Sequence, residues 1–125
     1  MKINEMSPSA LAYLGDSVIE LITRTTLVKK GMSNAGEMNR IALQYVKASS
    51  QSEAFDRMEP HLTEDELAWF KRGRNNHTMS KPKNATAADY RKATGLEVMF
   101  AYLYLTEQKE RMQELFEIGF RKTDF

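Results

Sequence analysis

The 125-residue chain contains no cysteine and only two histidines, His61 and His77. The absence of cysteine excludes disulfides and thiolate chemistry, and two histidines are too few ligands for a Cys/His zinc site. Any metal ion bound by this protein would therefore be held by oxygen atoms.

The chain also lacks a hydrophobic run long enough to cross a bilayer, which needs about 20 apolar residues. The first residues, "MKINEMSPSALAYLGD", do not follow the basic-then-apolar order of a secretion signal. We therefore expect a cytoplasmic protein without a membrane span.

Composition indicates a folded protein, because 42% of the residues are hydrophobic and 28% are charged. A chain of this length suits one domain, residues 1–125, built around a single core. Its formal net charge of +1 conceals a marked segregation of charge. Residues 71–92 carry seven Lys or Arg against one acid, Asp89, so the rest of the chain is acidic.

Capping residues and apolar spacing predict helices throughout. Ser7-Pro8 and Gly31 bound a first helix near residues 8–30, and a second begins at Ser33 or Asn34 and continues, with a break, into "KASSQSEAFDRM". A capping box of Thr63 and Glu66 starts a helix that we expect to end before Gly73. Thr86 caps a long helix to Leu105, and "QKERMQELFEIGF" forms the last helix. No stretch alternates as a strand would, so the predicted class is all-α.

The first helix is apolar on several sides, which is typical of a central helix. Leu14, Val18 and Leu21 form its expected inward stripe, and Asp16 and Glu20 lie one turn apart on the opposite face.

Three acids stand alone in the two most apolar helices of the chain: Asp16, Glu20 and Glu97. If the helices pack side by side, these carboxylates converge and repel one another. They can then share a proton, pair with cations such as Arg24 or Lys92, or bind a hard divalent cation such as Mg²⁺. The residues alone leave these alternatives open.

The basic segment falls mainly in an expected loop over residues 73–85. Its cations can neutralise phosphates, its amides can bind phosphate or sugar, and Gly73 permits close backbone approach. A solvated loop without function would have a similar composition. The candidate RNA-binding residues are Lys71, Arg72, Arg74, Asn75, Lys81, Lys83 and Asn84.

Several motifs, in this order, resemble the ribonuclease III family. "LAYLGDSVIE" is similar to the signature helix of its catalytic domain, and "FKRGRN", "PKN" and "YRKATGLEVMFAYLYL" resemble the compact bacterial Mini-ribonuclease III branch. The resemblance extends from about residue 10 to residue 105.

This resemblance implies an all-α endoribonuclease domain that acts as a homodimer on double-stranded RNA, without a separate domain for binding duplex RNA. It assigns catalytic metal binding to Asp16 and Glu97, with Mg²⁺ as the cofactor and Mn²⁺ as a substitute. It further implies 5′-phosphate and 3′-hydroxyl product ends and a role in maturing precursor 23S (large-subunit) ribosomal RNA.

The sequence departs from the larger family members at three positions. Acids that precede the two catalytic positions in those enzymes are replaced here by Ser9, Ala12 and Thr94. Fewer ligands leave the number of metal ions open. Glu20 matches a glutamate of the Mini-type motif and is either an outer-shell metal ligand or the partner of a basic residue.

Two other functions remain compatible with the residues. The first is a non-catalytic RNA-binding or ribosome-associated protein on the same fold, with structural acids. The second is an all-α Mg²⁺-dependent nucleotide pyrophosphatase, although the paired ExxE pattern of such enzymes is absent.

Overall fold

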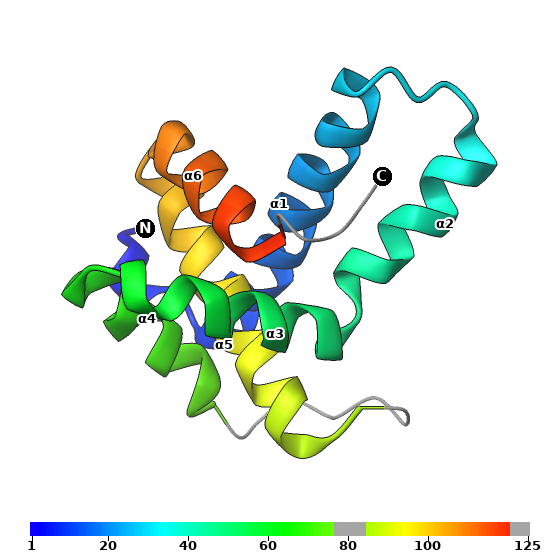
Figure 1. Cartoon of the computed structure of the whole chain (residues 1–125). Helices are drawn as coiled ribbons and strands as arrows, with labels where there is room; N and C mark the ends of the chain where they lie inside the picture. Colours follow the sequence, from blue (N-terminus) through cyan, green and yellow to red (C-terminus); the bar gives the residue numbers. More distant parts are fainter. Residues whose placement is uncertain (77–84, 121–125) are drawn as a thin grey trace.

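The computed structural model describes residues 1–76 and 85–120, and throughout these residues the protein is all-α, with no strand (Figure 1). Short 3₁₀ turns occur at Ile3–Glu5 and Glu59–His61. The α-helices are α1 (Pro8–Lys29), α2 (Ala35–Val46), α3 (Ala48–Met58), α4 (Glu64–Arg74), α5 (Ala87–Leu105) and α6 (Lys109–Phe120).

The predicted helix starts are confirmed by side-chain caps. Ser7 accepts a hydrogen bond from the Ala10 amide, and Thr86 caps the Asp89 amide in the same way. Gly31 ends the first helix region with a φ of 89°, a conformation that other residues rarely adopt. The break expected after α2 falls at Lys47, whose extended backbone separates α2 from α3.

The expectation that the first helix is central was wrong. The helix at the centre is α5, which packs most extensively on α1 and α4 and also contacts α3 and α6. Residues on all sides of α5 are buried. In contrast, α1 leaves Leu21, which we expected to point inward, exposed to solvent.

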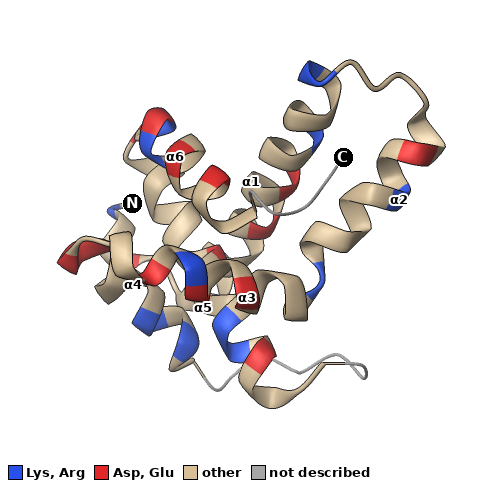
Figure 2. Cartoon of the chain, viewed as in Figure 1, with Lys and Arg blue, Asp and Glu red and all other residues tan. Residues whose placement is uncertain are grey.

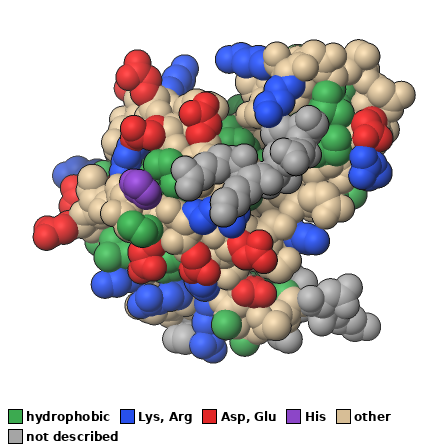
Figure 3. Space-filling view, viewed as in Figure 1, with side chains coloured by type: hydrophobic (Ala, Val, Ile, Leu, Met, Phe, Trp, Pro, Cys, Tyr) green, Lys and Arg blue, Asp and Glu red, His purple; other side chains and the backbone are tan. Residues whose placement is uncertain are grey.

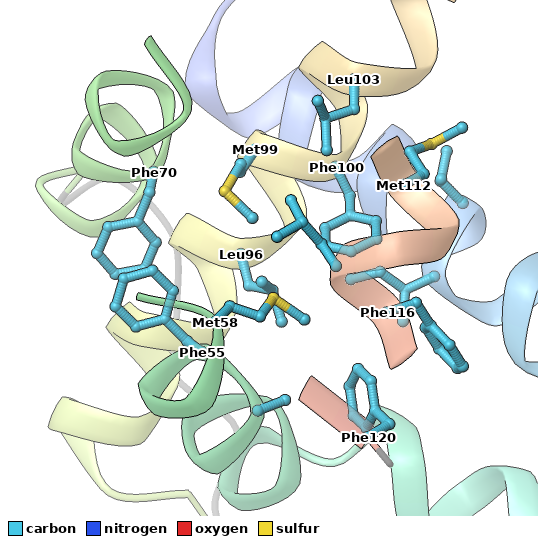
Figure 4. Close-up of a cluster of buried hydrophobic side chains, with 14 of the residues drawn as sticks. Phe55, Met58, Phe70, Leu96, Met99, Phe100, Leu103, Met112, Phe116 and Phe120 are labelled. Atoms are coloured by element: carbon cyan, nitrogen blue, oxygen red, sulfur yellow. The ribbon is translucent and has the colours of Figure 1, made fainter. Parts of the chain in front are cut away.

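The main core lies where α3, α4 and α6 meet α5 (Figure 4). The rings of Phe55 and Phe70 stack with centroids 3.7 Å apart, joining α3 to α4. Tyr45 of α2 stacks on Phe120 of α6 at 5.2 Å. These aromatic contacts fix the outer helices around α5.

A buried ion pair connects the start of α4 to α6. Arg111 donates hydrogen bonds to both carboxylate oxygens of Glu66, each at 2.8 Å, and to the carbonyl oxygen of His61 at 2.6 Å. Burial alone would raise the pKa of Glu66, but the hydrogen bonds from Arg111 and from the Thr63 capping box hold it below its ordinary value. The charge is thus fully satisfied inside the fold.

The helix that we expected to end before Gly73 continues through Arg74. Gly73 is buried because it packs directly on α5, so this contact maintains the helix beyond the glycine. Within residues 1–76 and 85–120, no helix is long and apolar enough to cross a membrane.

Candidate active site

The candidate site is built where α1 crosses α5 without any intervening side chain. A Cβ atom placed on Gly15 would lie 1.7 Å from the backbone oxygen of Glu97 and 2.4 Å from its carbonyl carbon. Only glycine allows such an approach. Because Asp16 follows Gly15 directly, this crossing brings the Asp16 and Glu97 carboxyl groups together.

The two carboxyl groups interact strongly. Glu97 is partly buried, whereas Asp16 is exposed on its helix. Burial, repulsion from the Asp16 charge, and a hydrogen bond with Asp16 together raise the pKa of Glu97 from an ordinary value of 4.5 to about 9. At neutral pH Glu97 therefore keeps a proton that it donates to Asp16.

No cation neutralises this pair among the residues that the structure describes. Lys92, one of the expected partners, instead pairs with Asp56 at 2.5 Å. Glu20 lies one turn after Asp16 but forms an ion pair with Arg24, at 2.7 Å. Of the three acids singled out in the sequence, the structure brings together Asp16 and Glu97 and gives Glu20 a basic partner.

The pair stands without a third acidic or imidazole ligand. Among residues 1–76 and 85–120, no group of three or more His, Cys, Asp or Glu side chains is arranged to hold a metal ion. Mg²⁺ is commonly bound through one or two carboxylates, with water and substrate phosphates completing its shell. The donor set of Asp16 and Glu97 therefore fits Mg²⁺ in number and chemistry.

The candidate RNA-binding residues of α4 lie at its C-terminal end, where Lys and Arg residues follow one another along the ribbon on the lower side of the view (Figure 2). Lys71 is exposed. The guanidinium of Arg72 lies 4.4 Å from the centroid of the Trp69 ring, and that of Arg74 donates to the side-chain oxygen of Asn75 at 3.2 Å. Lys81, Lys83 and Asn84, together with His77, lie outside the described residues.

Acidic side chains predominate elsewhere on this face, over α6, α3 and the start of α4 (Figure 3). The first turn of α4 contains Glu64, Asp65 and Glu66, and its last turn contains three cations. This segregation leaves the basic end of α4 as a distinct positive surface.

Two glycines have a packing role that the sequence pattern does not predict. Gly15 and Gly73 both lie inside helices, where an isolated glycine usually has a packing reason. Gly73 was expected to allow close approach of a ligand, but its close neighbour is the backbone of α5.

Metal-free protein should lose stability as the pH rises. Because the native state holds a Glu97 proton that the unfolded chain has already released, the stabilising contribution is complete below pH 4.5 and is lost by about pH 9. Glu97→Gln removes this titration, so its free energy of unfolding should fall less between pH 5 and 9, by about 1 kcal/mol or more. Urea denaturation in chelator measures both proteins, with Glu110→Gln on the exposed surface of α6 as the control. Identical pH profiles for wild type and Glu97→Gln would contradict the coupled pair.

Comparison with known proteins identifies the family of the chain. Residues 9–108 match the family described as "Ribonuclease III domain". Proteins named "Mini-ribonuclease 3" are 38% identical in Clostridium tetani, over 93% of this chain and 78% of that protein, and 41% identical in Enterococcus faecalis, over 89% and 86%.

A solved structure has the same architecture. The crystal structure of a Fusobacterium nucleatum protein superposes with a TM-score of 0.83 at 28% identity and covers 95% of both chains. The family match spans both α1 and α5, the helices that carry the paired carboxyl groups. The chain therefore belongs to the ribonuclease III family, as an endoribonuclease of the Mini-ribonuclease 3 group.

Proposed function

We propose that this endoribonuclease hydrolyses phosphodiester bonds in double-stranded RNA with Mg²⁺ held by Asp16 and Glu97. The observation that carries the proposal is the pairing of these two carboxyl groups at the Gly15 crossing, without a neutralising cation among the described residues. A divalent cation would remove the repulsion that keeps Glu97 protonated.

The acidic residues of the site have different proposed roles. Asp16 and Glu97 hold the cation at the crossing of α1 and α5. A bound Mg²⁺ supplies Lewis-acid polarisation of the scissile phosphate and activation of water, and Mn²⁺ can take its place. Glu20, which pairs with Arg24, is a candidate for the outer shell of the cation.

The basic end of α4 is the proposed docking surface for the RNA backbone. A-form RNA exposes phosphates and 2′-hydroxyls in its shallow groove, so charge and shape recognise it more than sequence does. Lys71 and Arg74 contact phosphates, and Arg72, stacked on Trp69, contributes charge from a fixed position. Asn75 belongs to this surface, and the proposal also assigns RNA binding to Lys81, Lys83 and Asn84, which lie outside the described residues.

We further propose a two-fold homodimer. Three apolar side chains of α1 are exposed, with Tyr13 83%, Leu21 61% and Val28 59% accessible. Several exposed apolar side chains on one helix favour an interface with another protein surface. A second copy of the chain is the occupant that brings two carboxylate pairs to one duplex, as cleavage of both strands requires. Sedimentation of the wild-type protein as a monomer at micromolar concentration would contradict the dimer.

The proposed products carry 5′-phosphate and 3′-hydroxyl ends, and the proposed natural substrate is precursor 23S ribosomal RNA in the cytoplasm. The test uses a labelled perfect RNA duplex and its separate single strands, with Mg²⁺ or with chelator, resolved on a denaturing gel. Cleavage restricted to the duplex with Mg²⁺ is the expected result. Equal cleavage in chelator would reject the metal, and equal cleavage of single strands would reject the substrate.

Neutralising the cations of α4 should weaken RNA binding and reduce its dependence on salt. For Lys71→Gln with Arg74→Gln, the slope of log K against log salt should fall by about 0.7–0.9 for each phosphate that the variant no longer neutralises. Filter binding of duplex RNA in Ca²⁺, at several salt concentrations, measures this slope. Lys109→Gln on α6 is the matched control, and an unchanged slope in the α4 variant would move the docking surface elsewhere.

A further inference from the structure

The basic end of α4 packs closely against α5 at Gly73. A Cβ atom on Gly73 would lie 2.7 Å from Cγ2 of Val98, and 2.8 Å from both the Cα of Gly95 and the backbone oxygen of Thr94. Real Cβ atoms essentially never come within 3.0 Å of such neighbours. Two of the three neighbours are backbone atoms, so any side chain at Gly73 would displace α4 itself.

Gly95 makes the reciprocal contact from α5. A Cβ atom there would lie 2.6 Å from the ring of Phe70 and 2.7 Å from its backbone oxygen. Gly95 precedes Glu97 by only two residues. The α4 contact is therefore made on the same turn of α5 that carries the site carboxyl group.

A second connection joins the end of α4 to α1. The side-chain amide of Asn76 donates a hydrogen bond to the hydroxyl oxygen of Ser9, at 3.1 Å. Ser9 lies two turns before Asp16 and on the same face of α1. The last turn of α4, through Gly73, and the segment just after it, through Asn76, thus contact the two helices that carry the paired carboxyl groups.

We infer that Gly73 is a positioning residue of the cleavage reaction, which sets the distance between the α4 cations and the Asp16–Glu97 pair. This inference rests on the proposed roles of the carboxylates and the cations. A phosphate held by Lys71 or Arg74 reaches the carboxylates only if α4 lies at its observed depth against α5. Misplacement by about 1 Å can lower a rate about 100-fold, whereas the binding charges remain on the surface.

The test compares Gly73→Ala with Gly119→Ala. A Cβ atom on Gly119 would also be crowded, at 2.4 Å from Cε of Met58 and 3.1 Å from Cβ of Ala54, but it lies between α6 and α3, away from the site. Single-turnover cleavage and duplex affinity are measured with Mg²⁺ and Ca²⁺ respectively, at a temperature where circular dichroism shows each protein folded. We expect Gly73→Ala to lose about 30- to 100-fold in rate with affinity within about threefold of wild type, and Gly119→Ala to retain both.

A double-mutant cycle on the hydrogen bond between Asn76 and Ser9 provides an independent measurement if Gly73→Ala does not fold. Asn76→Ala and Ser9→Ala should each lower the cleavage rate several-fold at unchanged affinity, and the double variant should lose no more than either one. A folded Gly73→Ala with the wild-type rate, a Gly119→Ala equally impaired, or full rates in both cycle variants would overturn the inference. Failure of the proposed function is seen separately, as wild-type protein that does not cleave duplex RNA with Mg²⁺.

Discussion

Asp16→Asn should lower the rate of duplex cleavage by about 10³-fold or more while leaving the protein folded. Loss of an outer-shell partner of a metal lowers metal affinity or activity by about 10- to 100-fold, and loss of a direct ligand should lower it further. Asparagine keeps the size of the side chain but removes the charge that binds the cation. The measurement is single-turnover cleavage of a labelled duplex with Mg²⁺.

The same substitution should stabilise the metal-free protein only near and above pH 9, where Glu97 loses its proton and the Asp16 charge would repel it. Mg²⁺ should raise the melting temperature of the wild type but not of Asp16→Asn, because only the wild type has the complete pair. Glu110→Gln serves as the charge-matched control and should behave as wild type in both assays. Normal turnover by Asp16→Asn would remove this residue from the catalytic assignment.

Gly15→Ala should cause the largest loss of stability of any single methyl addition in the described chain. The added carbon would overlap the Glu97 backbone oxygen, at 1.7 Å, and neither helix backbone can yield without moving the other. Overpacking of this kind costs about 3 kcal/mol, a large part of a typical total stability. The melting temperature should fall by about 10 °C or more.

Cleavage by Gly15→Ala should be lost even at temperatures where the protein is folded, since separation of α1 from α5 separates Asp16 from Glu97. Gly36→Ala on α2 is the control, because its nearest neighbour is the Asn34 side-chain oxygen at 3.3 Å and alanine favours a helix. A Gly15→Ala protein with the wild-type melting temperature and wild-type cleavage would disprove the close crossing.

Local signals in the sequence were sufficient for the helices. Ser7, Thr63 and Thr86 each predicted a helix start that the structure confirms, because capping involves only neighbouring residues. The position of α5 at the centre was not predictable in this way. Tyr13 and Leu21 make α1 look like a core helix, although they are exposed, and periodicity does not distinguish a core from an uncovered apolar face.

The sequence predicted which acids belong to the candidate site, but it did not predict which of them lie together. In the sequence, Asp16, Glu20 and Glu97 are equally strong candidates, because each is an acid within an apolar helix. Asp16 and Glu20 even share a helix face. The crossing at Gly15, a tertiary contact, brings Asp16 to Glu97 and leaves Glu20 to Arg24. Gly73 was misjudged for the same reason, since a helix partner far along the chain determines what a glycine approaches.

The ion pair between Glu66 and Arg111 restricts which substitutions the protein can tolerate during evolution. Loss of either partner leaves an uncompensated charge in the interior, at a cost of about 3–5 kcal/mol, whereas joint replacement by apolar residues of similar volume can be neutral. Substitutions at these two positions, 45 residues apart, should therefore occur together in descendants of this sequence. Removal of α6 would leave the buried Glu66 carboxylate without Arg111, so the last helix is needed for the stability of the fold.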